Sequence, residues 1–384
     1  MKTSLTQAEI LRYSRHVMMP GVGLEGQEKL KAASVLVVGT GGLGSPISMY
    51  LAAAGIGHLG LADYDVVDSS NLQRQIVHGT KAVGRPKVES ARDRLTDLNP
   101  FIQIDIYNEP MTLANMDRIG HDYDIIVDGT DNFPTRYLLN DYCVLNGKPF
   151  VYGSIFQFEG QVSVFDARTG PCYRCLFPDP VPVGMSPVSS ESGVFGVLPG
   201  TIGTLEASEA IKLILGIGEP LIGKLALYDA LDLSLQVIQL RKNLDCKICG
   251  THPEITQLTD PEVFCGVSYN GVNVQDIDQT LGISPETLKK KIENEHDYVL
   301  IDVRNPVELQ VSSLEQARNI PMNVLLSRIH EYDHNTELIL FCRTGTRSLR
   351  AARWLLQAGY KNVKYLKGGI NAWANQVDPT MMTY

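Results

Sequence analysis

The sequence lacks an excess of positive charge. Its 34 lysines and arginines are outnumbered by 43 aspartates and glutamates, which gives a formal net charge of −9 at pH 7. A protein that binds nucleic acid neutralises phosphates with clustered basic side chains, and no basic run of that kind is present. We therefore expect no nucleic acid as the main partner.

Long apolar segments are also missing. No run approaches the roughly 20 residues that a membrane-spanning helix needs, so we expect no membrane partner. Residues 1–16 contain no apolar segment typical of a secretory signal. The sequence therefore predicts a cytoplasmic protein. At 384 residues of ordinary globular composition, the chain is long enough for two or three domains.

A paired cysteine framework is absent as well. The seven cysteines are an odd-numbered set, which favours metal binding or catalysis over disulfides. Two pairs have the spacing Cys-x-x-Cys: Cys172, Cys175, Cys246 and Cys249. Four thiolates complete a closed tetrahedral site, so we expect a structural Zn²⁺, with a redox disulfide as the alternative.

Strand and helix patterns alternate through the first part of the chain. Residues 33–39 are predicted to form a buried parallel strand, and a helix is predicted to begin at Ser45-Pro46. This alternation predicts an α/β sheet that binds its ligand at the carboxyl ends of the strands. Further elements are expected at 58–63 (strand), 86–98 (helix), 102–107 (strand) and 123–128 (strand).

The pattern changes after Tyr152. Residues 161–165 alternate like an antiparallel strand, and residues 178–200, rich in Pro, Ser and Gly, are predicted to form a loop. A helix is expected at 206–215 and strands at 225–239. A mixed sheet is therefore predicted rather than a purely parallel one.

We predict two domains joined by a linker. The Rossmann-like domain covers residues 1–250, and residues 251–281 have the weak periodicity of a linker. Residues 282–384 show a second, smaller α/β pattern. Its expected elements are helices at 285–294 and 348–358 and strands at 298–304 and 338–342.

A glycine-rich loop follows the first predicted strand. Its glycines are Gly39, Gly41, Gly42 and Gly44. The pattern Gly-x-Gly-x-x-Gly lets a phosphate approach backbone N–H groups at a helix N-terminus. Asp63 ends the next strand, where a dinucleotide enzyme has its ribose-binding acid, so an NAD-dependent oxidoreductase is one alternative.

Further charged residues favour a triphosphate ligand. Arg74 and Lys87 supply two cations to neutralise phosphates, and Asp131 supplies a carboxylate for Mg²⁺. A simple hydride-transfer site needs no such set. These residues therefore predict an ATP site.

The motifs in this part of the chain resemble those of the MoeB/ThiF family, which is related to the ubiquitin-activating enzymes. The resemblance covers about residues 5–250. It is carried by Arg12-Tyr-Ser-Arg15-His16, the glycine loop, Asp63-x-Asp65, Ser70-Asn71-Leu-x-Arg74-Gln75, Lys87 and Asp128-x-Thr-Asp131-Asn132-x-x-x-Arg136. The family adenylates the C-terminal Gly-Gly carboxylate of small ubiquitin-fold sulfur carriers.

The resemblance implies a role for each site residue. Attack of a carboxylate on the α-phosphate needs positioning and charge neutralisation more than a base, which this set supplies. By position, Gly41 and Asp63 would contact the nucleotide, Asn71, Arg74 and Lys87 the phosphates, and Asp131 Mg²⁺, while Arg15 would enter from the other subunit of a homodimer.

The chain departs from the family at Ser189. Relatives that link covalently to their carrier have a cysteine before Glu-x-Gly, and Ser189 stands at the position of that cysteine. A hydroxyl is far less nucleophilic than a thiolate at neutral pH and forms no disulfide. We therefore assign Ser189 no catalytic role.

A second reactive loop is predicted around Cys342. The cysteine ends a strand, and a loop of six residues, Cys342-Arg-Thr-Gly345-Thr-Arg347, leads to a helix near Ser348. Backbone N–H groups and the two arginines are expected to face the sulfur, which lowers a thiol pKa and stabilises a persulfide anion. A buried structural cysteine is the alternative.

Residues 282–384 resemble a single-domain rhodanese. The similar segments are Asp302-Val-Arg304-Asn-Pro-x-Glu308, Asn319-Ile-Pro321, the cysteine loop and Gly368-Gly369-x-x-Ala-Trp373. The related phosphatases use a loop one residue longer for a larger anion, so the short loop favours sulfur. The resemblance implies a Cys342 persulfide, loaded by thiosulfate or a cysteine desulfurase. Cys265, in the linker, is interpreted as passive rather than as a relay thiol.

Together the two resemblances predict a fusion enzyme. It would adenylate the C-terminal glycine of a MoaD- or ThiS-type sulfur carrier and then transfer sulfur from Cys342 to form a thiocarboxylate. The thiocarboxylate would feed molybdopterin, thiamin, cysteine or tRNA sulfur chemistry. A non-catalytic scaffold that docks a ubiquitin-fold protein is a further alternative.

Overall fold

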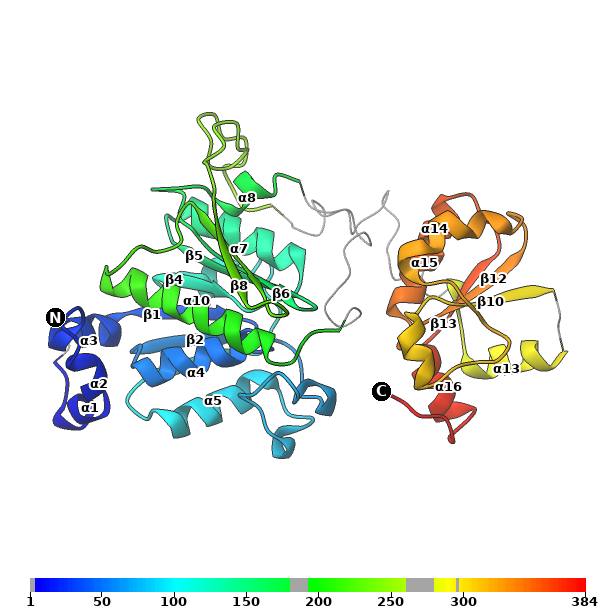
Figure 1. The fold of residues 1–384 in the computed structure, drawn as a ribbon, viewed down its shortest axis with the longest axis horizontal. Helices are drawn as coiled ribbons and strands as arrows, with labels where there is room; N and C mark the ends of the chain where they lie inside the picture. The colour runs from blue at the N-terminus through cyan, green and yellow to red at the C-terminus, as the bar shows by residue number, and fades with distance from the viewer. Residues whose placement is uncertain (1–3, 180–192, 260–279, 295–296) are drawn as a thin grey trace. The chain divides into compact units, whose positions relative to one another are not determined.

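The chain forms two compact units, Met1–Gly266 and Val267–Tyr384, each with its own β-sheet (Figure 1). The computed structural model describes residues 4–179, 193–259, 280–294 and 297–384. Ser189, Cys265 and most of the expected linker therefore lie outside the described residues. Within that linker, residues 251–259 form no helix or strand.

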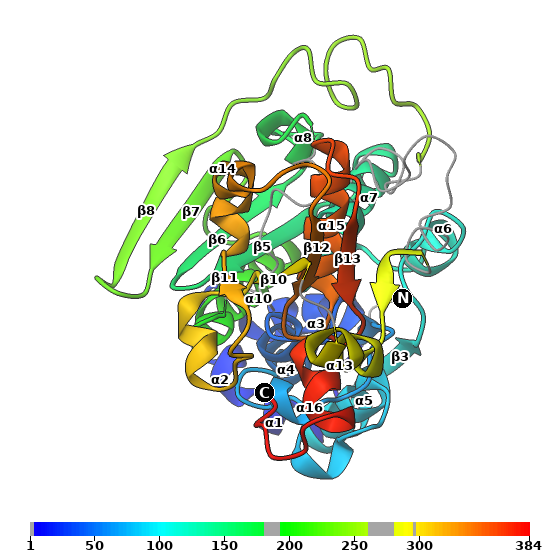
Figure 2. The same cartoon turned by 90° about the vertical axis from the view of Figure 1, so that its right-hand side faces the viewer.

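An eight-stranded mixed sheet organises the first unit. Strands β3, β2, β1, β4 and β5 pair in parallel, and β6, β7 and β8 continue the sheet in antiparallel pairings, which leaves β8 at the outer edge (Figure 2). The predicted mixed sheet is confirmed. The bounds are β1 Ser34–Val38, β2 His58–Ala62, β3 Gln103–Tyr107, β4 Ile125–Asp128, β5 Phe150–Phe156, β6 Glu159–Phe165, β7 Lys224–Asp229 and β8 Ser234–Gln239.

Helices cover both faces of this sheet. Val35 and Val37 of β1 share one apolar core with Ile47 and Leu51 of α4 and with neighbouring residues of α10, and α7 contacts β4 and β5. The helix bounds are α1 Gln7–Arg12, α2 Ser14–Val17, α3 Gly23–Ala32, α4 Gly44–Ala54, α5 Lys87–Leu98, α6 Met116–Gly120, α7 Phe133–Leu145, α8 Tyr173–Leu176 and α10 Leu198–Leu215. In the described part of the chain, no helix combines the length and apolarity that crossing a membrane requires.

Helix α10 begins earlier than the sequence indicates. The helix expected at 206–215 starts at Leu198. The prediction of a loop over 178–200 is therefore wrong for residues 198–200, which are helical. Glycines at 200 and 203 disfavour a helix when it is isolated, but packing against α4 decides the outcome. A Cβ atom built on Gly203 would lie 2.6 Å from the carbonyl oxygen of Leu43, so only glycine permits this close crossing.

The second unit is a three-layered α/β domain around a five-stranded parallel sheet, β11-β10-β12-β13-β9. Alternate residues of β12 face opposite sides: Leu338 and Leu340 pack with α15, and Ile339 and Phe341 with α13 and α16. The smaller α/β domain is thus confirmed. The bounds are β9 Gly282–Ile283, α13 Pro285–Asn294, β10 Tyr298–Asp302, β11 Arg318–Asn319, α14 Leu325–Arg328, β12 Glu337–Phe341, α15 Thr346–Gln357, β13 Val363–Leu366 and α16 Gly369–Gln376.

Candidate functional site

A cleft of about 450 Å³ lies in the first unit at the carboxyl ends of the parallel strands. Strand β1 pairs with β2 on one side and β4 on the other, and crevices of α/β sheets form where the strand order reverses in this way. Among the residues predicted from the sequence, the cleft is lined by Gly39, Gly41, Gly42, Asp63, Arg74, Lys87 and Asp131.

Asp63 fixes the glycine loop. One oxygen of its carboxylate accepts hydrogen bonds from the backbone N–H and the hydroxyl of Thr40, at 2.8 and 3.0 Å. The other accepts the backbone N–H of Asp65 at 2.9 Å. Asp63 therefore connects the ends of β1 and β2 and holds the loop in the conformation that lines the cleft.

Cations and carboxylates meet in the cleft. The ammonium of Lys87 lies 2.8 Å from a carboxylate oxygen of Asp65, and the backbone N–H of Lys87 donates to the carbonyl of Asp65. Arg74 also lines the cleft, where its guanidinium donates to the carbonyl of Ser70 at 3.3 Å. Asp131 adds a further carboxylate. This set can neutralise a polyphosphate and offers oxygen ligands to a divalent cation.

Three residues predicted for the site do not line the described cleft. Gly44 is the first residue of α4, behind the loop. The backbone carbonyl of Asn71 accepts the N–H groups of Arg74 and Gln75 at 3.0 and 2.9 Å, so Asn71 supports the segment that carries Arg74. Arg15 is exposed on α2. Their roles toward the nucleotide stay predictions.

A buried ion pair at the cleft, which Arg136 lines, received no role from the sequence. Nε of Arg136 lies 2.8 Å from the carboxylate of Asp128, and its Nη2 donates to the carbonyls of Thr130 and Gly153. Burial alone would lower the pKa of Arg136, but the Asp128 carboxylate holds this pKa above its ordinary value. The pair ties β4, β5 and α7 together. Both residues belong to the motif that carries the family resemblance. Because Asp128 ends β4 and Arg136 lies in α7, the sequence did not predict that they form an ion pair.

The four cysteines of the Cys-x-x-Cys pairs form one cluster. Cys172 and Cys175 stand at α8, Cys246 and Cys249 follow β8, and all four Sγ atoms lie within 4.8 Å of one another. Three of the Sγ–Sγ distances are 3.4, 3.6 and 3.9 Å. A tetrahedral Zn²⁺ with Zn–S bonds of about 2.3 Å separates its sulfurs by about 3.8 Å, so the cluster has the right ligands and dimensions for zinc.

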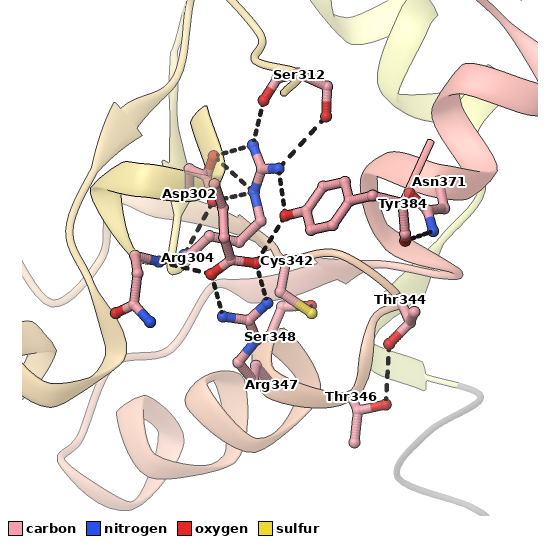
Figure 3. A network of polar contacts seen from close by, with 12 residues as sticks. Asp302, Arg304, Ser312, Cys342, Thr344, Thr346, Arg347, Ser348, Asn371 and Tyr384 are labelled. Carbon is pink, nitrogen blue, oxygen red and sulfur yellow. Dashed lines mark hydrogen bonds and ion pairs between the residues drawn. The ribbon is translucent and has the colours of Figure 1, made fainter. Parts of the chain in front are cut away.

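The second unit surrounds Cys342 with hydrogen-bond donors. The Cys342 side chain is buried at the end of β12, and the backbone N–H of Gly345 lies 3.1 Å from its Sγ. The hydroxyl of Ser348 lies 3.6 Å from the same sulfur (Figure 3). Gly345 has a φ of 96°, a left-handed conformation that favours glycine and lets the chain turn around the sulfur.

The positive charge of Arg347, which was expected to face the sulfur, is paired with a carboxylate. Its guanidinium pairs with both carboxylate oxygens of Glu308, at 2.7 and 2.6 Å, and the pair is largely buried. Arg347 is therefore neutralised by Glu308. Among the described residues, the backbone N–H of Gly345 and the hydroxyl of Ser348 donate hydrogen bonds to Sγ.

Comparisons with known proteins agree with both sites. Residues 13–248 match the ThiF family and residues 284–376 match the rhodanese-like domain. The probable adenylyltransferase/sulfurtransferase MoeZ of Mycobacterium tuberculosis is 44% identical over 388 residues, which cover 100% of this chain and 97% of that protein. Adenylyltransferase and sulfurtransferase MOCS3-1 of Zea mays is 40% identical, covering 99% of this chain and 85% of its own length.

Relatives of the first unit alone are also found. The sulfur carrier protein adenylyltransferase of Thermus thermophilus is 51% identical over 267 residues, 68% of this chain and 98% of that protein. The crystal structure of E. coli MccB with a MccA derivative has a TM-score of 0.56 at 24% identity, covers 62% of this chain and 75% of that one, and shows a shared fold. The chain belongs to the ThiF family and carries a rhodanese-like domain after its ThiF region.

Proposed function

We propose that the chain is an ATP-dependent adenylyltransferase and a sulfurtransferase for a ubiquitin-like sulfur carrier that ends in Gly-Gly. The observation that carries this proposal is the presence, in one chain, of a cation-lined cleft behind a glycine loop and of a buried thiol in a loop of hydrogen-bond donors. Curated relatives over the whole chain bear both activities in their names.

In the adenylation step, the carboxylate of the carrier's terminal glycine attacks the α-phosphorus of ATP, and pyrophosphate leaves with the electron pair of the broken P–O bond. Arg74 and Lys87 neutralise the phosphates, and a second subunit of a homodimer supplies Arg15. Asp131, in a cleft rich in carboxylate oxygens, would hold Mg²⁺, which supplies further charge neutralisation when bound.

In the transfer step, the Cys342 thiolate attacks the sulfane sulfur of thiosulfate, and sulfite leaves with the electron pair of the broken S–S bond. The terminal sulfur of the persulfide then attacks the carbonyl carbon of the acyl adenylate, and AMP leaves. A thiol reductant cleaves the resulting acyl disulfide and releases the thiocarboxylate. A cysteine desulfurase is the other source of sulfur that we propose for loading Cys342.

The zinc site is proposed as structural. Four cysteine ligands leave no open coordination position for a substrate, and the cluster joins the segment at α8 to the chain after β8. Zinc there would stabilise the first unit without entering the reaction.

We propose that residues 1–250 carry adenylation, 251–281 form the linker and 282–384 carry sulfur transfer, in the cytoplasm. The family matches at 13–248 and 284–376 support this division. The names of the MOCS3 relatives point to molybdenum cofactor biosynthesis as one use of the product.

ATP–pyrophosphate exchange in the presence of a Gly-Gly-ended carrier tests the proposal. Exchange that requires both the carrier and Mg-ATP supports it. Carrier binding without exchange would indicate a docking scaffold, and tight NADH binding without ATP binding would indicate an oxidoreductase.

A further inference from the structure

Tyr384 contacts four residues of the second unit near Cys342 (Figure 3). Its hydroxyl donates to a carboxylate oxygen of Glu308 at 2.7 Å and accepts from Nη1 of Arg304 at 3.0 Å. Its backbone carbonyl accepts from the side-chain amide of Asn371 in α16 at 3.0 Å. The guanidinium carbon of Arg343 lies 5.6 Å from the centre of the Tyr384 ring.

Two of these partners, Glu308 and Asn371, each hold a part of the Cys342 loop. Glu308 binds Arg347, at the far end of the loop, through two hydrogen bonds. The backbone N–H of Asn371 donates to the carbonyl of Arg343 at 3.1 Å. The backbone N–H of the preceding residue, Ile370, donates to the carbonyl of Cys342 at 2.8 Å. Tyr384 thus lies where the supports of the loop converge.

The three arginines around Tyr384 differ in how far their charge is neutralised. Arg304 is fully buried and pairs with Asp302, and Arg347 pairs with Glu308. Arg343 makes no ion pair with any carboxylate in the described ranges, and its guanidinium lies over an aromatic ring. A ring face attracts a cation without cancelling its charge. Arg343, half-buried and next to Cys342, therefore keeps a positive charge for an incoming anion.

The Tyr384 hydroxyl stays protonated over the physiological range. Burial and the hydrogen bond to Glu308 raise the pKa of Tyr384 to about 12. Burial alone would raise the pKa of Glu308, but hydrogen bonds from Arg347 and Tyr384 hold this pKa below its ordinary value. The phenol therefore donates to an ionised carboxylate, and the network keeps one arrangement at neutral pH.

We propose that Tyr384 is a positioning residue for sulfur transfer, which holds Arg343 beside Cys342 as an unneutralised cation that recruits an anionic sulfur donor. The proposal rests on the sulfurtransferase function proposed above and adds the residue that sets donor affinity. The ring performs this role, and the hydroxyl secures Arg347 through Glu308.

Sulfur transfer from thiosulfate to cyanide, measured with the full chain, tests the role of the ring. Tyr384→Leu removes the ring and keeps apolar bulk, and Tyr384→Phe keeps the ring. We expect the leucine variant to raise the KM for thiosulfate about three- to tenfold with kcat nearly unchanged, and the phenylalanine variant to keep KM within about twofold of wild type.

A matched control exists in the same unit. The guanidinium carbon of Arg318 lies 5.7 Å from the centre of the Tyr332 ring, and Nη1 of Arg318 donates to the Tyr332 hydroxyl. Within the described ranges, Tyr332 makes no hydrogen bond or ring contact with a residue of the Cys342 loop. Tyr332→Leu should leave KM for thiosulfate unchanged. A double-mutant cycle isolates the pair: in an Arg343→Met background, Tyr384→Leu should raise KM no further.

The outcomes separate this proposal from the function on which it rests. A wild-type KM in a folded Tyr384→Leu variant, or the same rise of KM in the Arg343→Met background as in wild type, would overturn the positioning role. Absence of transfer by wild type, or full transfer by Cys342→Ala, would instead overturn the sulfurtransferase assignment. Near-ultraviolet circular dichroism of each variant verifies the fold. If the leucine variant unfolds, a rise of KM by about three- to tenfold in the phenylalanine variant, which keeps the ring, would overturn the role of the ring.

Discussion

The ammonium nitrogen of Lys87 lies 2.8 Å from a carboxylate oxygen of Asp65, and only 7% of the lysine side chain is exposed. The lysine begins α5 and projects into the cleft, while Asp65 is more than half exposed. The pair therefore fixes a cation in the cleft, where we propose that the phosphates of ATP bind. A charge fixed in this way stabilises a transition state most strongly when it lies where new charge develops during phosphoryl transfer.

Lys87→Met should slow ATP–pyrophosphate exchange by about 10²- to 10³-fold, the usual effect of removing one preorganised stabilising group. Methionine is an unbranched side chain of similar length that lacks the ammonium group. Lys29→Met is the matched control, because Lys29 is exposed and pairs with Glu25 on the surface at 3.3 Å. Equal exchange rates in the two variants would contradict the role of Lys87.

Glu206 makes the stability of the first unit depend on pH. This carboxyl group of α10 is fully buried against Gly153, and neither oxygen has a hydrogen-bond partner among the described residues. Burial, with the nearby Asp128 charge, raises the pKa of Glu206 well above its ordinary value. The folded protein therefore keeps a proton that the unfolded chain loses once the pH rises above the ordinary carboxyl pKa.

The contribution of Glu206 to the free energy of unfolding is thus greatest at acid pH and declines as the pH rises toward the raised pKa, by up to about 1.4 kcal/mol per pH unit. Glu206→Gln removes this decline. The stability of the variant relative to wild type should rise between pH 5 and pH 8 in urea unfolding, whereas the exposed Glu25→Gln should show no such trend. A constant difference across this range would contradict a protonated Glu206.

The four-cysteine cluster should carry one Zn²⁺ per chain. Cys246→Ser removes one ligand, and the variant should lose the metal and unfold at a temperature lower by roughly 5 °C or more, because structural zinc typically contributes several kcal/mol. Native mass spectrometry and thermal unfolding measure the two effects. Cys143→Ser, at a buried thiol outside the cluster, should keep the zinc. A wild-type chain purified without zinc, and no more stable with it, would contradict the assignment.

Local motifs could be predicted from the sequence because they lie within one strand, its loop and the next helix. The glycine loop and Asp63 lie together at the cleft for this reason, and Gly345 lies beside Cys342 in the same way. The start of α10 could not be predicted. Its first turns contain Pro199 and two glycines, and packing on α4, rather than helix propensity, makes them helical.

Pairings between distant residues could not be predicted either. Glu308 and Arg347 are 39 residues apart, and Tyr384 joins Glu308 from 76 residues away. The sequence placed two arginines near Cys342 but gave no sign that a carboxylate neutralises one of them. Such contacts depend on how β10, α15 and α16 pack, which no local pattern records.

The most direct test of the account is the mass of a Gly-Gly-ended carrier after incubation with the protein, Mg-ATP, thiosulfate and a thiol reductant. We predict that one terminal oxygen is replaced by sulfur in a reaction that requires both ATP and Cys342, while Cys342→Ala keeps ATP–pyrophosphate exchange. A carrier that gains sulfur equally well with Cys342→Ala, or without ATP, would contradict the coupling of the two sites.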